Sequence, residues 1–468
     1  MGQALISRGG GVGGAAKAKV EIIAPLGATL TISQGDVVFT REVESSPVEM
    51  SLGYGVWTIS ASGAATKTID IDVLKVYEVN VRDVTYGISI DMSNGDPAAA
   101  VTYTDDAVGY SALSCNDSTG ACDYGSWEGA ITGIIGCKPC LYKDGARVAY
   151  LNPNNYAQFE DGSAADITSG NAGEVMVEFK KTWYKYAVSG DTLTFQIANY
   201  DRTADGFVCS AFKSNDGTAT VKDFMYFGAY EGYSKGGDDK CHSLSGKDVL
   251  NDENWWTYSD FRTKCKAFGA SYGMEDWVKR YYILGLLMLV TKTRGIQAAI
   301  GDGNLGSGSC INSGTMDARG LFYGVNDGGN TGVKAFGIEH LWGNTWSWCD
   351  GIITMSESTL GIKECAPYND TGEGYTVIAD GYQRDSGLYP TKLTTALNGA
   401  VVVASSGQSD ASQGWCDYVY VDSYSGYVAF VGGSYDVNVG LGGPFYAYIY
   451  DGPGYGYCGN YVGRLVSA

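Results

Sequence analysis

Hydrophobic and polar positions alternate in short runs between Lys19 and Val81, and Gly, Pro or Ser residues separate one run from the next. The runs are KVEIIAP, ATLTISQG, DVVFTREV, VEMSLG, VWTISASG, TKTIDIDV and YEVNV. This alternation predicts strands that place one face toward a core and the other toward solvent. Because many short strands follow one another closely, we expect a small all-β sandwich over residues 19–85. The Gly-rich residues 1–18 are expected to form a flexible leader.

The pattern changes after this module. Residues 82–106 are rich in Asn, Asp, Pro and Ala, which predicts a connection to a second domain over residues 86–468, with the boundary near Tyr86. Ser259 is expected to cap a short amphipathic helix. A stronger helix is predicted in MEDWVKRYYILGLLMLVTKTRG, because acidic residues stand in its first turn and basic residues in its last. It is apolar on nearly all sides and is expected to be buried, with only strands and long loops after it.

The C-terminal tract, at about residues 416–465, contains another strand pattern. In PFYAYIYD the alternation places Phe445, Ala447 and Ile449 on a packed face and the intervening tyrosines on a solvent face. Tyrosine offers a large contact area and has few torsions to order, so an exposed row of tyrosines is typical of a binding surface. The competing interpretation is a Tyr-rich core whose hydroxyls are satisfied internally.

Composition narrows the classes of partner. The formal net charge of −20 disfavours binding to nucleic acid or to anionic membrane surfaces. The longest apolar run, Tyr281 to Val290, is too short to cross a bilayer, so no membrane insertion is expected. The N-terminus has no signal-peptide pattern, which indicates synthesis in the cytoplasm. The 12 cysteines are therefore expected to be reduced rather than joined in a disulfide framework.

The second domain resembles a known family. YFGAYEGY, FGIEHLWGNTWSWCDGI, WCDYVYVDSYSGYVAFVGGSYD and a final VGRL occur in an order similar to that of tail-fibre and receptor-binding proteins of phages of gut Firmicutes. Many of those proteins are similar to the variable proteins of diversity-generating retroelements. The resemblance covers roughly residues 86–468 and implies a C-type lectin fold of the formylglycine-generating-enzyme subtype, in an α+β chain. The first module looks like PEGA-type and other immunoglobulin-like modules.

The resemblance also implies a function. In this family, retroelement diversification replaces adenines of AAC or AAT codons, which never yields Lys, Glu, Gln, Met or Trp, and residues 416–468 lack all five types. We therefore expect a virion-tail protein of a phage or prophage that binds a bacterial surface receptor, either protein or glycan. Related fibres suggest a homotrimer. The expected ligand-binding residues are Val419, Val421, Tyr435, Asp436, Val437, Val439, Leu441, Tyr446, Tyr448, Tyr450, Asp451, Tyr455, Tyr457 and Tyr461.

Two alternatives stay open. The enzyme that names the fold subtype oxidises cysteine with a pair of copper-binding thiols, one of which follows the GGS strand. Here GGSYDVN has no cysteine, and only Cys416 and Cys458 occur in the tract. We therefore expect no enzymatic activity, no catalytic residue, no metal site and no cofactor, although the loop Asn326 to Asn330 also permits a calcium interpretation. The second alternative is a structural tail or adhesin subunit without a ligand of its own.

Overall fold

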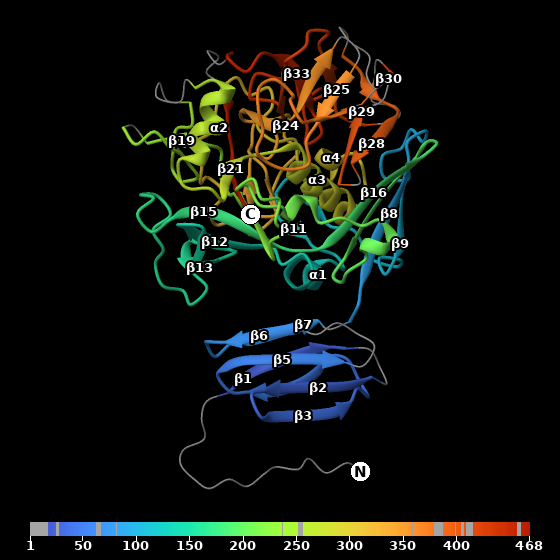
Figure 1. Ribbon diagram of the computed structural model, residues 1–468, viewed down its shortest axis with the longest axis vertical. Helices are drawn as coiled ribbons and strands as arrows, with labels where there is room; N and C mark the ends of the chain where they lie inside the picture. The colour runs from blue at the N-terminus through green and yellow to red at the C-terminus, as the bar shows by residue number, and fades with distance from the viewer. Residues whose placement is uncertain are drawn as a thin grey trace. The chain divides into compact units, whose positions relative to one another are not determined.

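The computed structural model describes residues 17–24, 28–61, 67–80, 82–235, 237–250, 256–356, 359–378, 387–397, 399–403, 407–408, 415–455 and 460–468. The chain divides into two compact units, Met1–Val84 and Thr85–Ala468, which Figure 1 shows as ribbons. The division falls beside Tyr86, where the sequence pattern placed the boundary. The predicted leader lies outside the described residues up to residue 16.

The first unit contains two sheets, with the strand orders β4-β1-β7 and β3-β2-β5-β6. Each alternating run of the sequence forms one strand. The strands are β1 (Ala18–Ile23), β2 (Thr29–Gln34), β3 (Val37–Glu42), β4 (Val48–Leu52), β5 (Gly55–Ala61), β6 (Lys67–Ile71) and β7 (Val76–Asn80). Val20 and Ile22 of one sheet share a buried cluster with Leu30, Ile32 and Ile59 of the other. The two sheets therefore enclose a common core, as expected for a small sandwich.

The predicted connection over residues 82–106 is wrong for most of its length. Two strands, β8 (Thr85–Asp91) and β9 (Val101–Asp105), occupy it. They belong to a four-stranded sheet of order β16-β17-β8-β9, with β16 at Trp183–Ser189 and β17 at Thr192–Ala198. Ile88 and Ile90 are fully buried in this sheet. The Asn, Asp and Pro residues that suggested a linker lie in the loop between β8 and β9.

Two larger sheets organise the rest of the second unit (Figure 1). The first has the order β14-β13-β12-β15-β18-β35-β21. Its strands are β12 (Lys138–Lys143), β13 (Ala146–Asn152), β14 (Asn155–Phe159), β15 (Glu174–Lys180), β18 (Phe224–Gly228), β21 (Tyr272–Met274) and β35 (Leu465–Ser467). The end of the chain thus forms an inner strand of this sheet, between β18 and β21.

The second large sheet carries the C-terminal tract. Its order is β26-β25-β24-β32-β33-β31, and β34 pairs with β24. Its strands are β24 (Trp346–Ser356), β25 (Thr359–Ile362), β26 (Thr376–Ile378), β31 (Val419–Val421), β32 (Val428–Val431), β33 (Ala447–Asp451) and β34 (Tyr461–Val462). Short strand pairs complete the unit, namely β10 (Ser114–Cys115) with β11 (Cys122–Asp123), β19 (Tyr233–Ser234) with β20 (Cys241–His242), β22 (Lys334–Ala335) with β23 (Ile338–Glu339), β27 (Tyr389–Pro390) with β30 (Gly407–Gln408), and β28 (Leu393–Leu397) with β29 (Ala400–Val403).

The described helices are few and short. They are α1 (Glu128–Gly133), α2 (Tyr258–Lys266), α3 (Trp277–Thr291) and α4 (Ile296–Ile300), with 3-10 turns at Thr203–Asp205 and Ser210–Phe212. The predicted helix α3 is confirmed, and all of its residues are buried. Asp276 is its N-cap and Lys292 its C-cap, so the charges that were expected in its first and last turns flank the helix instead. The cap of α2 is Thr257 in a capping box with Asp260, so the expectation of Ser259 is wrong. Helix α4 also corrects the expectation that no helix follows α3.

Buried arginines fix the C-terminal tract to other elements of the second unit. The Arg280 guanidinium lies 2.7 Å from the Glu275 carboxylate and donates to the main-chain oxygens of Leu341 and Pro444 at 3.0 and 2.9 Å. Arg464 donates to the main-chain oxygen of Gly228 at 3.1 Å. Each of these donors satisfies backbone groups that would otherwise be buried without a partner. The loop before β33 is consequently fixed to the core helix.

The second unit combines sheets with a buried helix, so the α+β class predicted from the sequence is confirmed at this level, with strands in the majority. Cys115 and Cys122 form a disulfide, which corrects the expectation that every cysteine is reduced. The two residues are direct partners in the β10–β11 register, which places their side chains opposite each other. Within the described part of the chain, no helix combines the length and apolarity that crossing a membrane requires.

Candidate functional site

A row of aromatic side chains crosses the second large sheet. The strand register pairs Trp348 with Phe430, Phe430 with Tyr448, and Tyr448 with Tyr420, over β24, β32, β33 and β31. Cross-strand partners point to the same face of a sheet, so the four rings form one continuous row. Trp348 and Phe430 are buried, whereas Tyr448 and Tyr420 are half-buried. The row therefore begins in the core and ends at solvent.

The rings of this row contact one another closely. Tyr420 stacks on Tyr448 with centroids 4.6 Å apart and an interplanar angle of 14°. Phe430 stacks on Tyr448 at 5.4 Å, and the edge of Trp348 meets Phe430 at 5.4 Å. Stacked and edge-to-face aromatic pairs are favourable beyond the area that they bury. The exposed tyrosines thus rest on a rigid buried base.

Three further tyrosines extend the row toward solvent. Tyr450 contacts Tyr448 at 5.6 Å and Tyr427 at 6.2 Å, and Tyr427 contacts Tyr424 at 5.6 Å. Tyr450 is 43% exposed and Tyr424 is 66% exposed. We refer to Tyr420, Tyr424, Tyr427, Tyr448 and Tyr450 as the tyrosine face.

Strand β33 follows the predicted alternation in part. Ala447 and Ile449 are buried, Tyr448 is half-buried and Tyr450 is exposed, as the pattern PFYAYIYD indicated. Tyr446 is buried instead, which corrects the expectation that it faces solvent. It precedes the strand, and its ring packs against Trp346 at a centroid distance of 4.7 Å. Burial accordingly raises the pKa of the Tyr446 hydroxyl.

Val419, Val421 and Asp451 were also expected at the surface, and all three are buried. The valines flank Tyr420 on β31, so their side chains point to the opposite face of the sheet. Asp451 is in phase with the buried Ala447 and Ile449 along β33, so alternation alone already indicated its burial. Across the strand, Val428 pairs with Asp451 and Ala429 pairs with Ile449, so Tyr450 is the extra residue of a β-bulge.

The loop between β32 and β33 holds a second group of expected binding residues. Asp436 is exposed, and Tyr435, Val437, Val439 and Leu441 are half-buried. The Asp436 carboxylate accepts a hydrogen bond from the Asn460 side chain at 3.0 Å. The Tyr435 amide donates to the Asn344 main-chain oxygen at 3.0 Å. These contacts fix the loop to neighbouring segments and leave part of it at the surface.

The last expected residues follow β33. Tyr455 is 46% exposed. Tyr461 is half-buried and stacks on Trp348 with centroids 5.1 Å apart, so it joins the buried end of the aromatic row. Tyr457 and Cys458 lie outside the described residues.

Three tyrosines of this face were not predicted as binding residues, namely Tyr420, Tyr424 and Tyr427. Tyr420 lies between Val419 and Val421 in the run DYVYVD. The same alternation that was applied to PFYAYIYD assigns Tyr420 to the face opposite the valines, so a usable signal was present. Tyr424 and Tyr427 lie in the turn before β32, where no period indicates which side chains reach the surface.

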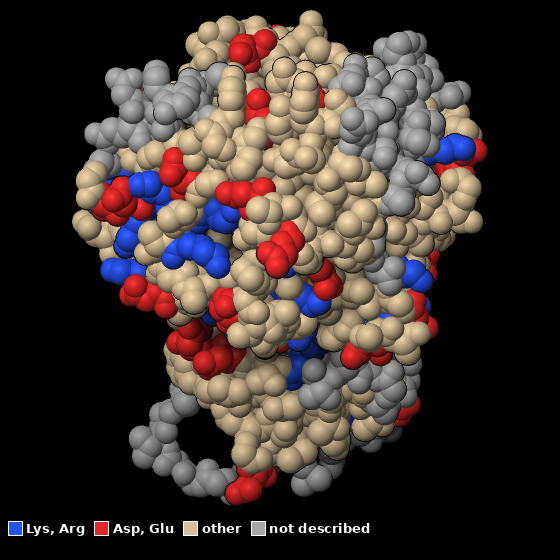
Figure 2. All heavy atoms as spheres, turned by 45° about the horizontal axis from the view of Figure 1, so that its top comes forward, with Lys and Arg blue, Asp and Glu red and all other residues tan. Residues whose placement is uncertain are grey.

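Acidic groups dominate the electrostatics of the tyrosine face. Asp422 and Asp451 are 6% and 7% exposed. Burial raises the pKa of the Asp451 carboxyl to about 6, and the neighbouring Asp422 acts in the same direction. In Figure 2, the uppermost part of the surface is mainly uncharged, with scattered red atoms, and the Lys and Arg atoms lie lower in the view.

The enzymatic alternative depends on the cysteines, the histidines and the acidic side chains. No set of three His, Cys, Asp or Glu side chains capable of holding a metal ion occurs among the described residues. Burial raises the pKa of the Cys416 thiol to about 11, which disfavours the thiolate that redox chemistry requires. His242 and His340 lie within hydrogen-bonding distance of Glu174 and Glu231, at 2.9 and 3.0 Å.

One cavity of about 90 Å³ lies beside α2. Arg262 lines it, but its guanidinium binds the carboxylates of Asp350, at 2.7 Å, and Asp370, at 2.5 Å. Its charge is therefore neutralised within the fold, and the cavity offers no free cation from this residue. Comparison of the chain with models of protein families and with curated proteins finds no match.

Proposed function

We propose that this chain is a receptor-binding protein of a phage or prophage tail fibre, and that its tyrosine face contacts a bacterial surface receptor. The proposal includes a C-type lectin fold of the formylglycine-generating-enzyme subtype in residues 86–468, an immunoglobulin-like first unit and retroelement diversification of the C-terminal tract. The observation that carries it is the aromatic row, in which exposed tyrosines stand on a buried base.

The chemistry of the tyrosine face favours binding over catalysis. Phenol rings provide both apolar contact and a hydroxyl, and few torsions are lost when they bind. Tyr448 is held between Tyr420 and Phe430 by stacking, so much of its ordering occurs before a ligand arrives. Preorganisation of this kind increases affinity because less entropy is lost on association.

The arrangement also suits a tract that varies in sequence. The main chain of the tract is held by groups outside it, such as Arg280, which donates to Pro444. Inside the tract, the Asp417 carboxylate accepts from the Phe445 amide at 2.7 Å. Exposed side chains such as Tyr424 and Tyr450 take no part in these bonds. Exchanging them therefore leaves the supports of the fold in place.

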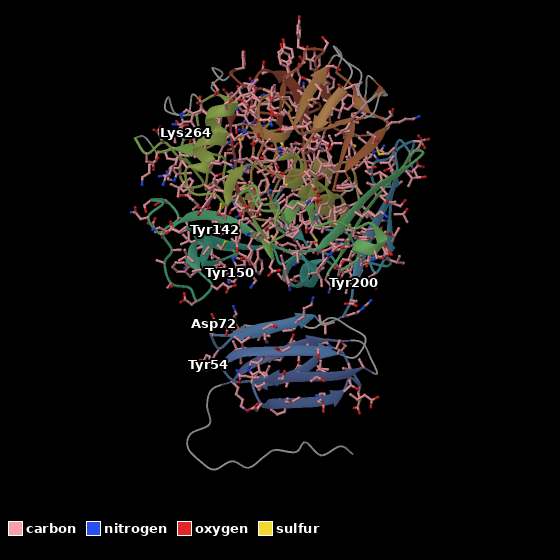
Figure 3. The ribbon with its side chains drawn as sticks, viewed as in Figure 1. Tyr54, Asp72, Tyr142, Tyr150, Tyr200 and Lys264 are labelled. Carbon is pink, nitrogen blue, oxygen red and sulfur yellow. A yellow bond between two sulfur atoms is a disulfide. The ribbon has the colours of Figure 1, made fainter. Side chains whose placement is uncertain are left out.

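Binding of the fluorescently labelled chain to a panel of bacterial cells and to a glycan array tests the proposal. We expect a bound partner on at least one of them, and we expect the double variant Tyr420→Ala, Tyr448→Ala to lose about 2 kcal/mol or more of binding free energy. Tyr54→Ala is the matched control, because Tyr54 is 52% exposed and lies in the first unit (Figure 3).

Two results would contradict the proposal. One is binding by the double variant that equals binding by the control. The other is a chain that binds neither cells nor glycans, which favours the structural-subunit alternative. Melting curves of both variants show whether the second unit is still folded, so that loss of binding is not mistaken for unfolding.

A further inference from the structure

Asp451 is a buried carboxylate that faces the same side of the sheet as the tyrosine face. Val428 and Phe430 are two residues apart on β32, so their partners Asp451 and Tyr448 point to one face. Asp451 is 7% exposed, and among the described residues no donor bonds to its carboxylate. A buried carboxylate without a partner is costly unless something neutralises it.

Asp422 is a second carboxylate on this part of the sheet. It is two residues after Tyr420, and its amide donates to the Ile449 main-chain oxygen at 2.9 Å, next to β33. Its carboxylate accepts from the Tyr424 amide at 3.1 Å and from the Ser423 hydroxyl at 3.5 Å. These neutral donors do not cancel its charge. The two acids therefore repel each other at one position on the tyrosine face.

No cation of the tract balances this pair. Residues 415–468 contain Asp417, Asp422, Asp436 and Asp451 but no Lys or His, and Arg464 is their one basic residue. Arg464 is 1% exposed, and it donates to main-chain oxygens in the core. Among the described residues, Asp422 is the charged group that acts on the Asp451 carboxyl, and it raises the pKa of that carboxyl.

Two tyrosines of the tyrosine face lie within electrostatic range of the two carboxylates. Asp422 and Asp451 both act electrostatically on the Tyr427 hydroxyl, and Asp451 also acts on Tyr448. The faces of tyrosine rings attract cations, and this attraction grows when the site is shielded from water. Carboxylates and ring faces therefore both favour a cationic ligand, and they disfavour phosphate, sulfate and carboxylate ligands.

We propose that Asp422 and Asp451 bind a cationic group of the receptor, an ammonium or a guanidinium, which the rings of the tyrosine face enclose. The proposal rests on the proposed function, because it names the ligand chemistry of the same surface. The cationic group of the receptor would then pair with the Asp451 carboxylate, which accepts no hydrogen bond from the described residues. Anionic receptors are thereby excluded as direct ligands of this part of the face.

Pairs of cationic and neutral probes of equal shape test the inference. Choline is compared with 3,3-dimethylbutan-1-ol, and arginine amide with citrulline amide, by titration of the full chain in NMR or calorimetry. We expect at least one cation to bind at least tenfold more tightly than its neutral counterpart. Asp451→Asn is expected to reduce cation binding at least tenfold, since the carboxamide carries no charge.

The matched control is Asp191→Asn, because Asp191 is an exposed acid in the turn between β16 and β17. This variant is expected to bind the cation as the unchanged chain does. Equal binding of both members of each probe pair, or absence of cation binding, overturns the inference. Unchanged cation binding by Asp451→Asn also overturns it. Melting curves identify a variant that fails to fold, in which case Asp422→Asn replaces it.

The failure of this inference differs from the failure of the proposed function. If Tyr420→Ala with Tyr448→Ala abolishes binding to cells while Asp451→Asn binds them normally, the tyrosine face recognises a receptor without a cation. If neither change affects cell binding, the proposed function itself is wrong.

Discussion

Two groups of tyrosines in the second unit have opposite surroundings. On the first large sheet, the Tyr142 ring contacts the rings of Tyr226 and Tyr272 with centroids 4.2 and 5.4 Å apart, and Figure 3 labels Tyr142. We refer to these three residues and Tyr150, which shares the Glu178 carboxylate with Tyr226, as the closed cluster. The Tyr150 and Tyr226 hydroxyls donate to the Glu178 carboxylate at 2.6 and 2.9 Å, and the Tyr142 hydroxyl bonds to the Ser467 hydroxyl at 2.9 Å. In this cluster the polar end of each of these rings is satisfied inside the fold.

The buried carboxylate beside each group of tyrosines also has different partners. Glu178, which is 1% exposed, forms an ion pair with Arg147 at 2.8 Å in addition to its two tyrosine donors. Asp451 has a neighbouring carboxylate in place of an arginine. A buried acid with three donors stabilises its surroundings, whereas an acid without donors is a cost that a ligand can remove. The comparison separates tyrosines that build the fold from tyrosines that are available for binding.

The largest expected effect tests the closed cluster. Glu178→Gln removes the charge that Arg147 and two tyrosine hydroxyls share, and we expect it to lower the free energy of unfolding by about 2 to 3 kcal/mol. Asp451→Asn is the matched change on the tyrosine face, and it is expected to leave stability at pH 7 unchanged or raised. Denaturant unfolding measures both. An equal loss in the two variants would show that Asp451 has partners comparable to those of Glu178.

A smaller effect concerns pH. The folded-state pKa of Asp451 is raised from 3.8 to about 6, so its contribution to stability is fully present below pH 3.8 and is lost as the pH rises through about 6. Between pH 5 and pH 7 we expect the unchanged chain to lose about 1 kcal/mol relative to Asp451→Asn. The titratable groups that interact electrostatically with Asp451 are Asp422, Tyr427 and Tyr448.

Asp417 titrates in the same range, because burial raises its pKa to about 7. It is present in both proteins, so its contribution cancels in the difference between their unfolding free energies. If the difference in unfolding free energy between the unchanged chain and Asp451→Asn stays constant from pH 5 to pH 7, the raised pKa of Asp451 is contradicted. NMR titration of the carboxyl carbons measures that pKa directly.

Sequence patterns predicted the regular elements well where one period extends over a whole element. The strands of the first unit, the helix α3 and the alternation of Ala447, Tyr448 and Ile449 follow directly from such periods. The closed cluster was not predicted, because Tyr142, Tyr226 and Tyr272 come from distant strands that only the tertiary fold brings together.

The errors at the candidate site have local causes. Asp451 is in phase with the buried Ala447 and Ile449, so the alternation that was applied to PFYAYIYD already indicated its burial, and its assignment to the surface did not follow that alternation. Tyr446 was assigned to a strand that begins one residue later, so its packing on Trp346 was missed. The connection predicted over residues 82–106 was wrong because Asn, Asp and Pro in one loop outweighed the short strands on either side.

The central claim is that the tyrosine face binds and the closed cluster stabilises. Receptor binding and thermal unfolding of Tyr450→Ala and Tyr226→Ala, measured side by side, test it most directly. Tyr450 is 43% exposed and Tyr226 is 9% exposed. We expect Tyr450→Ala to weaken binding by about 2 kcal/mol with an unchanged melting temperature. We expect Tyr226→Ala to cost about 3 kcal/mol of stability. Loss of stability in Tyr450→Ala as large as in Tyr226→Ala, with binding retained, would contradict the claim.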